Sequence, residues 1–397
     1  MSALSGHILT PAGFVRGELA IAADGRIERV HGTPVSEAAA RADTALPLVL
    51  PGFIDTHVHG GGGADTMDAG DSVATLARLH ARHGTTALLA TTMTAPLAEI
   101  EAALRALAPQ CEGAARGKHG RGGKHGNGGQ RASGAARVLG VHLEGPYISA
   151  ERLGAQPPFT RPPSLAEIAA LDAIAPIRLL TLAPEVPGNL ALIPALVERG
   201  IRVQIGHSIA SYEEAVQALE RGAAGFTHLF NAMSGLHHRA PGTAGAALAH
   251  AQHAELIPDL LHVHAGAIRA ALRAIPGLFC VSDSTAAAGM PDGDYRLGRQ
   301  AVRKCEGGVR LADGTLAGST LTLDQALRNL VSLGLTVAEA SARTSTQAAD
   351  YLGLGSERGR LVAGAWGDIV LLDARSLEVR AVFIEGEPVS LAGVADA

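Results

Sequence analysis

A carboxylate at the predicted end of a buried strand is the first residue of this chain with evident chemical use. Residues 138–143 form an apolar run that includes His142, Glu144 follows it, and Gly145 and Pro146 end it. An ionised glutamate beside an apolar core needs a cation, a metal ion or hydrogen-bond donors, because burial removes its hydration. Glu144 therefore requires a partner from elsewhere in the chain, unless it is a surface carboxylate just past the strand.

Two histidines that follow other short apolar runs, His207 and His228, are candidate partners for Glu144. A lone histidine in such a position is more often a residue of the core or of its rim. Two imidazoles and one carboxylate, however, are a ligand set that leaves Zn²⁺ or a similar ion one open position for water. The sequence therefore predicts that Glu144, His207 and His228 bind a metal ion.

His57 and His59 end the first predicted strand and suggest a second metal subsite. At a spacing of two residues, both side chains lie on the same face of a strand. In many two-metal barrel hydrolases a carbamylated lysine from the fourth strand bridges the ions, but none of the three lysines here lies near a predicted strand end. This pattern excludes a lysine-bridged centre and makes Glu144 the candidate bridging carboxylate.

Asp283 follows the last predicted strand and has no basic residue beside it. A water on a metal ion has its pKa lowered to about 7, and a nearby aspartate can take its proton and return it to the leaving group. We therefore expect Asp283 to be the catalytic proton carrier. The alternative is a purely structural cap.

The loop after the sixth predicted strand carries a candidate phosphate site. The backbone N–H groups of Asn231 and Ala232, with the guanidinium of Arg239 nearby, could bind a phosphate, to which arginine offers a paired donor fork. As a bare pattern this signal is weak, and His237 and His238 could simply line the loop.

These residues form a site only in a fold that brings strand ends together. Short apolar runs alternate with helical segments, which is typical of βα units and a parallel sheet. Ser164 and Ser211 open predicted capping boxes, and Gly84, Gly200 and Gly222 mark predicted helix ends. Eight runs predict an α/β fold of the (β/α)8 TIM-barrel type, whose chemistry lies at the carboxyl ends of the strands. The runs are residues 52–55, 86–90, 138–143, 179–183, 202–206, 225–227, 255–257 and 278–282, of which the seventh is the weakest.

An open doubly wound sheet is the alternative, but no glycine-rich phosphate fingerprint follows the first strand. Both ends of the chain instead read as short strands with turn residues, including an Asp-Gly pair at 24–25 that favours a hairpin. We expect residues 1–50 and 356–397 to pair into a small β-sandwich-like domain beside a barrel of residues 51–355.

Residues 113–136 do not fit the barrel pattern. They are rich in glycine and basic residues, contain a near repeat with His119 and His125, and are too poor in apolar residues to fold. We interpret them as a flexible insertion on the face opposite the site, although nucleic-acid binding or metal capture is an alternative.

The composition narrows the class of protein. The chain has 397 residues, a hydrophobic content of 47% and a net charge of −5, which favours a globular enzyme over a nucleic-acid-binding protein. Its three cysteines are widely spaced, and neither a signal peptide nor a long apolar run is evident. We expect a cytoplasmic protein that does not associate with membranes.

Several motifs together resemble a known family. Residues 51–59, Pro-Gly-Phe-Ile-Asp-Thr-His-Val-His, resemble the first-strand signature of the amidohydrolase superfamily. Nearly the whole chain outside residues 113–136 is similar to the N-acetylglucosamine-6-phosphate deacetylases. The similarity includes His-Leu-Glu-Gly-Pro-Tyr at 142–147, Thr-His-Leu-Phe-Asn-Ala-Met at 227–233 and Ala-Gly-Met-Pro-Asp-Gly-Asp-Tyr at 288–295.

The resemblance implies a metal-dependent enzyme that releases acetate from N-acetylglucosamine 6-phosphate. It implies Glu144, His207 and His228 as metal ligands and Asp283 as proton carrier. Some members lack the two histidines of the first strand and use one metal, whereas this chain has both. One or two divalent ions per subunit (Zn, with Fe, Mn or Co as alternatives) and a homodimer or larger assembly are also implied. The implied substrate contacts are Ala155, Asn231, Ala232, Arg239, His262, Leu316, Ala317 and Gly318.

The chain departs from the family pattern at two places. Gln156 stands where a substrate-side histidine is usual, ahead of a proline-rich stretch at 157–163, and residues 257–261 replace the usual Ala-Asp-Gly before His262. An amide donates a hydrogen bond but carries no charge, so substrate preference could differ. The alternatives are therefore a deacylase of another N-acyl amino sugar or N-acyl amino acid, and a noncatalytic barrel that binds sugar phosphates.

Overall fold

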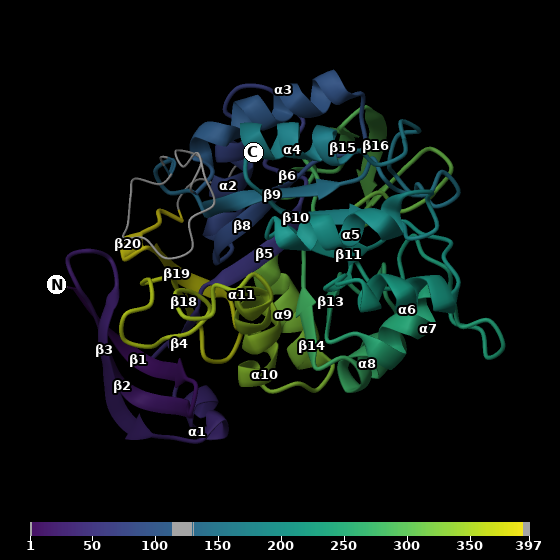
Figure 1. Ribbon diagram of the computed structural model, residues 1–397. Helices are drawn as coiled ribbons and strands as arrows, with labels where there is room; N and C mark the ends of the chain where they lie inside the picture. Colours follow the sequence, from purple (N-terminus) through teal and green to yellow (C-terminus); the bar gives the residue numbers. More distant parts are fainter. Residues whose placement is uncertain (1, 113–128, 130, 392–397) are drawn as a thin grey trace.

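Eight strands form the barrel in the computed structural model, which describes residues 2–112, 129 and 131–391 (Figure 1). They are β5 (Phe53–Val58), β8 (Thr85–Thr91), β9 (Arg137–Glu144), β10 (Ile177–Leu182), β11 (Arg202–Ile205), β12 (Gly225–Phe226), β13 (His253–Leu256) and β14 (Gly277–Cys280). Each of the eight predicted runs overlaps one of these strands, including the weak seventh.

The eight strands close into a TIM-type barrel, as predicted. Six make one sheet in the order β12-β11-β10-β9-β8-β5, and β13 pairs with β14 in parallel. Backbone hydrogen bonds join the two groups at both edges: Leu229 N donates to Glu255 O at 2.8 Å, and Asp283 N donates to His57 O at 2.8 Å. All strands therefore present their carboxyl ends on one face.

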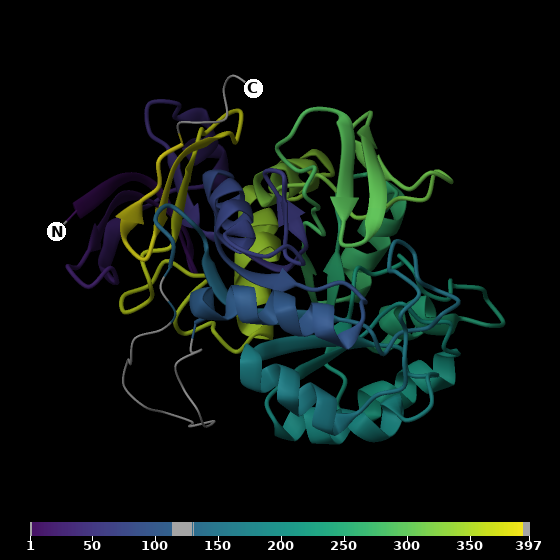
Figure 2. The same ribbon diagram turned by 90° about the horizontal axis from the view of Figure 1, so that it is seen from above.

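Helices surround the strands (Figures 1 and 2). The strands are almost wholly buried, and the helices supply the outer layer of the core. The helices are α2 (Ser72–Arg82), α3 (Leu97–Leu107), α4 (Leu165–Ile174), α5 (Asn189–Glu198), α6 (Tyr212–Glu220), α7 (Gly242–His250), α8 (Ala265–Ala274), α9 (Leu323–Ser332), α10 (Val337–Ser341) and α11 (Gln347–Tyr351), with a 3₁₀ turn η1 (Ala108–Gln110) and a π-helical turn η2 (Ala342–Thr346).

The predicted helix boundaries are confirmed. Ser211 and Glu214 form a complete capping box at the start of α6. At the start of α4 the Ser164 side chain accepts a hydrogen bond from Glu167 N, but the Glu167 carboxylate pairs with Arg161 and Tyr147, so the predicted capping box there is only half formed. After α2, α5 and α6 the chain turns through glycines with φ of +86°, +81° and +107°, a conformation that side chains with a Cβ rarely adopt. The glycines are Gly84, Gly200 and Gly222.

Strands from both ends of the chain form a second sheet, which Figure 2 shows as purple and yellow strands side by side. Its order is β20-β19-β18-β4-β1-β2-β3, and β18 runs antiparallel to β4 with Ile369 opposite Pro51. The predicted pairing of the two ends is thus confirmed, whereas the boundaries at residues 50 and 356 stay predictions. Its strands are β1 (Ser2–Thr10), β2 (Gly13–Ile21), β3 (Ile27–Pro34), β4 (Leu48–Pro51), β18 (Ile369–Leu372), β19 (Val379–Ile384) and β20 (Glu387–Pro388), with the short helix α1 (Glu37–Ala42) before β4.

An antiparallel ribbon that was not predicted follows β14. It consists of β15 (Gly293–Leu297), β16 (Gln300–Cys305) and β17 (Gly308–Arg310), and it packs through Leu297, Val302 and Val309 on Met93 after β8. A second small hairpin, β6 (Gly60–Gly61) with β7 (Ala64–Asp65), follows β5. Both follow strand ends, on the face of the barrel where the predicted site lies.

Most of the predicted insertion, including His119 and His125, lies outside the described residues. Within the described part of the chain, no helix is long and apolar enough to span a membrane.

Candidate metal centre

The ends of β9, β11 and β12 bring three predicted ligands together. His207 Nε2 lies 3.0 Å and His228 Nε2 lies 3.2 Å from Glu144 Oε1, and the two imidazole nitrogens are 3.1 Å apart. All three residues are at most 5% exposed. Glu144 thus has the partners that its burial requires.

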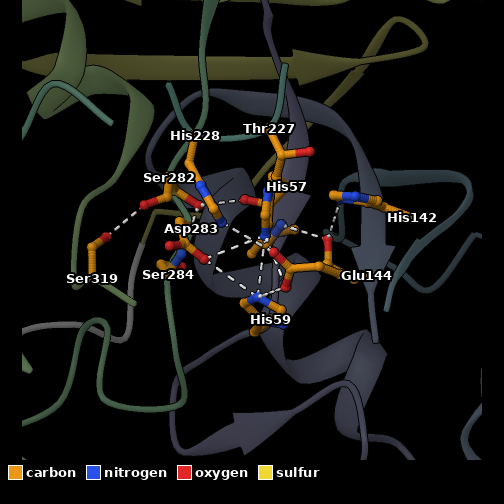
Figure 3. A network of polar contacts seen from close by, with 12 residues as sticks. His57, His59, His142, Glu144, Thr227, His228, Ser282, Asp283, Ser284 and Ser319 are labelled. Atoms are coloured by element: carbon orange, nitrogen blue, oxygen red, sulfur yellow. Dashed lines mark hydrogen bonds and ion pairs between the residues drawn. The ribbon is translucent and has the colours of Figure 1, made fainter. Parts of the chain in front are cut away.

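A second group meets the other oxygen of Glu144. His59 Nε2 is 3.2 Å and His57 Nε2 is 3.5 Å from Glu144 Oε2. The same two nitrogens lie 3.3 Å and 3.4 Å from Asp283 Oδ1, and Figure 3 shows these side chains pointing toward one another. Glu144 therefore stands between two clusters, one on each carboxylate oxygen.

Both clusters fit a divalent cation. Within each set (Glu144, His207 and His228, or His57, His59 and Asp283), one ligand atom per residue lies within 4.8 Å of the others. Imidazole nitrogens and carboxylate oxygens that converge in this way are the ligand types of a divalent cation, which each imidazole would bind in its neutral form.

Charge coupling keeps the two carboxylates ionised. Burial alone would raise the pKa of Glu144, but the charge of His57 and the hydrogen bonds of His207 and His228 hold it well below its usual range. Against the same effect of burial, His57 and His59 lower the pKa of Asp283 to about 2. Both groups are therefore anionic at neutral pH and suited to hold a cation.

The backbone is strained where three of these side chains leave their strands. His207, His228 and Asp283 have φ of +47°, +27° and +48°, the left-handed region that residues other than glycine seldom occupy. Such conformations persist at functional sites, where the surrounding structure enforces them. Here they turn the side chains from the strand direction toward the common centre.

A layer of buried polar residues lies beneath the ligands. His142 Nε2 is 2.7 Å from Thr181 Oγ1, and burial lowers the pKa of His142 to about 3, so its ring is neutral. Glu255 on β13 is fully buried, and its Oε2 lies 3.0 Å from His57 Nδ1. Sequence reasoning missed Glu255, although a carboxylate inside the apolar seventh run was a usable signal.

Gln156, which stands at a family-divergent position, contacts the metal ligand itself. Its Nε2 donates to Glu144 Oε2 at 2.6 Å, and its Oε1 accepts from Thr94 N at 2.7 Å. The residue also lines the cavity beside the ligands, so it borders both the metal centre and the space for a substrate.

A cavity of about 310 Å³ opens above the clusters and contains most of the predicted substrate contacts. Among the described residues, Arg239 and Ala317 are outside its lining: Ala317 is fully buried, and the exposed Arg239 donates to His238 Nε2 at 2.9 Å. The predicted contacts that line the cavity are Ala155, Asn231, Ala232, His262, Leu316 and Gly318.

One of the two backbone N–H groups predicted to bind a phosphate already has a hydrogen-bond partner within its own loop. Asn231 N donates to His228 O at 3.0 Å, so this N–H closes the loop and is not free for a phosphate. A basic residue that the sequence did not suggest, Arg152, lines the cavity instead. His262 also lines it, and its Nδ1 lies 2.6 Å from Asp259 Oδ2.

Comparisons with known proteins find relatives along nearly the whole chain. A sequence model of the amidohydrolase family matches residues 48–389. An N-acetylgalactosamine-6-phosphate deacetylase from Escherichia coli O157:H7 is 40% identical over 96% of this chain and 97% of its own length. An N-acetylglucosamine-6-phosphate deacetylase from Lysinibacillus sphaericus is 38% identical over 89% of each chain.

Solved structures give the same result. The N-acetylglucosamine-6-phosphate deacetylase of Thermotoga maritima is 33% identical, with a TM-score of 0.83 over 98% of this chain and 99% of its own. A mutant of the Mycobacterium smegmatis deacetylase in complex with N-acetyl-D-glucosamine-6-phosphate is 34% identical, with a TM-score of 0.84 over 98% of both chains.

Proposed function

The chain belongs to the amidohydrolase family, and from that premise we propose that it is a metal-dependent deacetylase. Its substrate is N-acetylglucosamine 6-phosphate, and its products are glucosamine 6-phosphate and acetate. The observation that carries this proposal is the meeting of Glu144, His207 and His228 with Asp283 at one cavity, in a chain similar along its length to deacetylases of amino-sugar phosphates.

The side chains of the site have two roles, metal binding and proton transfer. Glu144, His207 and His228 hold the ion, with His57 and His59 as a second subsite. A bound ion supplies a Lewis acid that lowers the pKa of water and stabilises negative charge on the amide oxygen. Asp283 accepts a proton from the attacking water and delivers it to the amide nitrogen as the C–N bond breaks. Imidazole and carboxylate ligands favour Zn²⁺, with Fe, Mn and Co as alternatives.

The predicted substrate contacts orient the sugar phosphate. Ala155, His262 and residues 316–318 are our proposed contacts to the sugar and acyl groups, and Ala232 and Arg239 those to the phosphate. We also propose a cytoplasmic location and a homodimer or larger assembly. The three free cysteines support a reducing compartment.

An acetate-release assay on N-acetylglucosamine 6-phosphate tests substrate and metal together. Chelation is expected to abolish release, and addition of Zn²⁺, Mn²⁺, Fe²⁺ or Co²⁺, one at a time, is expected to restore it with at least one ion. Release that is unaffected by a chelator, or absent with every ion, would contradict the proposal.

A second candidate substrate is N-acetylgalactosamine 6-phosphate, which differs only in the configuration at C4. It is supported by the relative that is 40% identical over 96% of this chain and that bears this activity in its name. The amide of Gln156 in the cavity is consistent with an altered sugar preference. Comparison of kcat/KM for the two epimers decides between them, with unphosphorylated N-acetylglucosamine as the control for the phosphate.

A further inference from the structure

Glu255 is a buried carboxylate to which neither the proposed ligand sets nor the catalytic steps give a role. It is fully buried on β13, and four groups from three other strands or their ends surround it. Its Oε1 accepts from Thr56 Oγ1 at 3.0 Å and from Gln204 Nε2 at 3.2 Å. Its Oε2 faces His57 Nδ1 at 3.0 Å and His228 N at 3.4 Å.

These contacts determine what His57 presents to the cavity. Thr56 and Gln204 fix one oxygen of the carboxylate, so the other faces the imidazole as an acceptor. His57 would therefore keep its proton on Nδ1 when a cation takes the place of the proton on Nε2, and Nε2 is directed to the side where Glu144 Oε2 and Asp283 Oδ1 lie. A carboxylate on the far nitrogen of a histidine ligand is the usual way to fix its tautomer and ring orientation.

We infer that Glu255 is a positioning residue that makes His57 a metal ligand; its contact with the backbone N–H of His228 is the longer one, at 3.4 Å. This inference rests on the proposed function, because it presupposes the metal centre. It links the two clusters through one side chain, since His57 belongs to one and His228 to the other.

Direct coordination is the competing role, because His57, His142 and Glu255 also lie within the distance for a common ion. The contacts disfavour it. His142 Nε2 is engaged by Thr181 Oγ1 at 2.7 Å, and its Nδ1 lies 3.5 Å from Thr91 Oγ1. Glu255 has donors on both oxygens, so an ion there would have to displace several hydrogen bonds.

The substitution Glu255→Gln tests the tautomer. Gln204 and Thr56 retain the carbonyl oxygen of the new amide, so its NH₂ group faces His57 Nδ1 and forces the ring proton to Nε2. In a titration with Zn²⁺ alone, followed by calorimetry and metal analysis, the parent chain is expected to bind two ions. The variant is expected to keep one tight ion and bind the second 10–100-fold more weakly. Glu167→Gln, which removes a carboxylate paired with Arg161 and Tyr147, is the matched control.

Equal affinities in the parent and Glu255→Gln would overturn the inference, as would binding of a single ion by both. Binding of no ion by the parent would instead contradict the proposed function. A second measurement does not depend on the variant's folding: ¹⁵N NMR of the Zn²⁺-loaded parent, with His57 assigned through His57→Asn. It is expected to show a protonated Nδ1 and a metal-bound Nε2 for His57. The opposite pattern overturns the inference.

Discussion

The side-chain amide of Gln156 forms one hydrogen bond with Glu144 and one with the backbone of Thr94. Its Nε2 lies 2.6 Å from Glu144 Oε2, and its Oε1 lies 2.7 Å from Thr94 N. Because the backbone N–H can only donate and an ionised carboxylate can only accept, the orientation of the amide is fixed. Gln156 is therefore a neutral donor to the ligand, where an imidazole could also have carried a positive charge.

Loss of this donor is expected to weaken metal binding. Gln156→Met keeps a similar length but leaves Glu144 Oε2 without the hydrogen bond that orients it, so we expect Zn²⁺ affinity to fall about 10–100-fold. Competition with a chromogenic chelator measures this change. Gln217→Met on the exposed surface of α6 is the control, and an unchanged affinity of Gln156→Met would refute the role.

Removal of the proton carrier is expected to separate catalysis from metal binding. Asp283→Asn keeps the shape of the side chain but cannot accept a proton, so turnover is expected to fall about 10²–10⁴-fold. The ion at Glu144, His207 and His228 is expected to remain, because these three ligands are intact. Acetate release and metal content are measured on the same preparation. Near-normal turnover would reject the assignment of Asp283.

His262 is expected to be protonated more readily than an ordinary histidine, which favours an anionic substrate in the cavity. Burial alone would lower the pKa of His262, but the Asp259 carboxylate 2.6 Å away raises it above its ordinary value. In Asp259→Asn that support is lost, so His262 becomes neutral at a lower pH. The KM for the phosphorylated substrate is then expected to rise several-fold at pH 7.5 and much less at pH 5.5. An equal rise in KM at both pH values would indicate a structural effect.

The parts of the fold that local patterns encode could be predicted. The barrel strands are buried and read as short runs rich in apolar residues, and His207, His228 and Asp283 follow such runs directly. Because the carboxyl ends of parallel strands in a barrel share one face, their meeting with Glu144 also follows from the sequence.

The remainder depends on partners that are distant in the chain. Glu255 lies in a run whose apolar neighbours give no sign of Thr56 or Gln204, and its role appears only when three strands meet. The same applies to Gln156, which the sequence places on the substrate side, because its contact with Glu144 depends on the path of the loop after β9. The β15–β17 ribbon was missed since its strands are short and half exposed.

Acid pH is expected to weaken the ion pairs of Glu385, which join the barrel to the terminal sheet. This residue follows β19, and its carboxylate lies 2.7 Å from the Arg358 guanidinium and 2.5 Å from that of Arg137 at the start of β9. Burial alone would raise its pKa, but the hydrogen bond of Arg137 and the charge of Arg358 lower it from 4.5 to about 2.

A lowered pKa in the folded state means that this interaction stabilises the protein above pH 4.5 and is lost as the pH falls toward 2. The shift corresponds to at most about 3 kcal/mol, less for incomplete burial. Glu385→Gln is therefore expected to lower the free energy of unfolding in urea at pH 7, and the difference from the parent is expected to shrink between pH 4 and pH 3. Glu387→Gln, a neighbouring carboxylate with a side chain that is 74% exposed, is expected to have little effect at either pH. A difference that stays constant across this pH range would show that Glu385 stabilises the junction through packing and not through its charge.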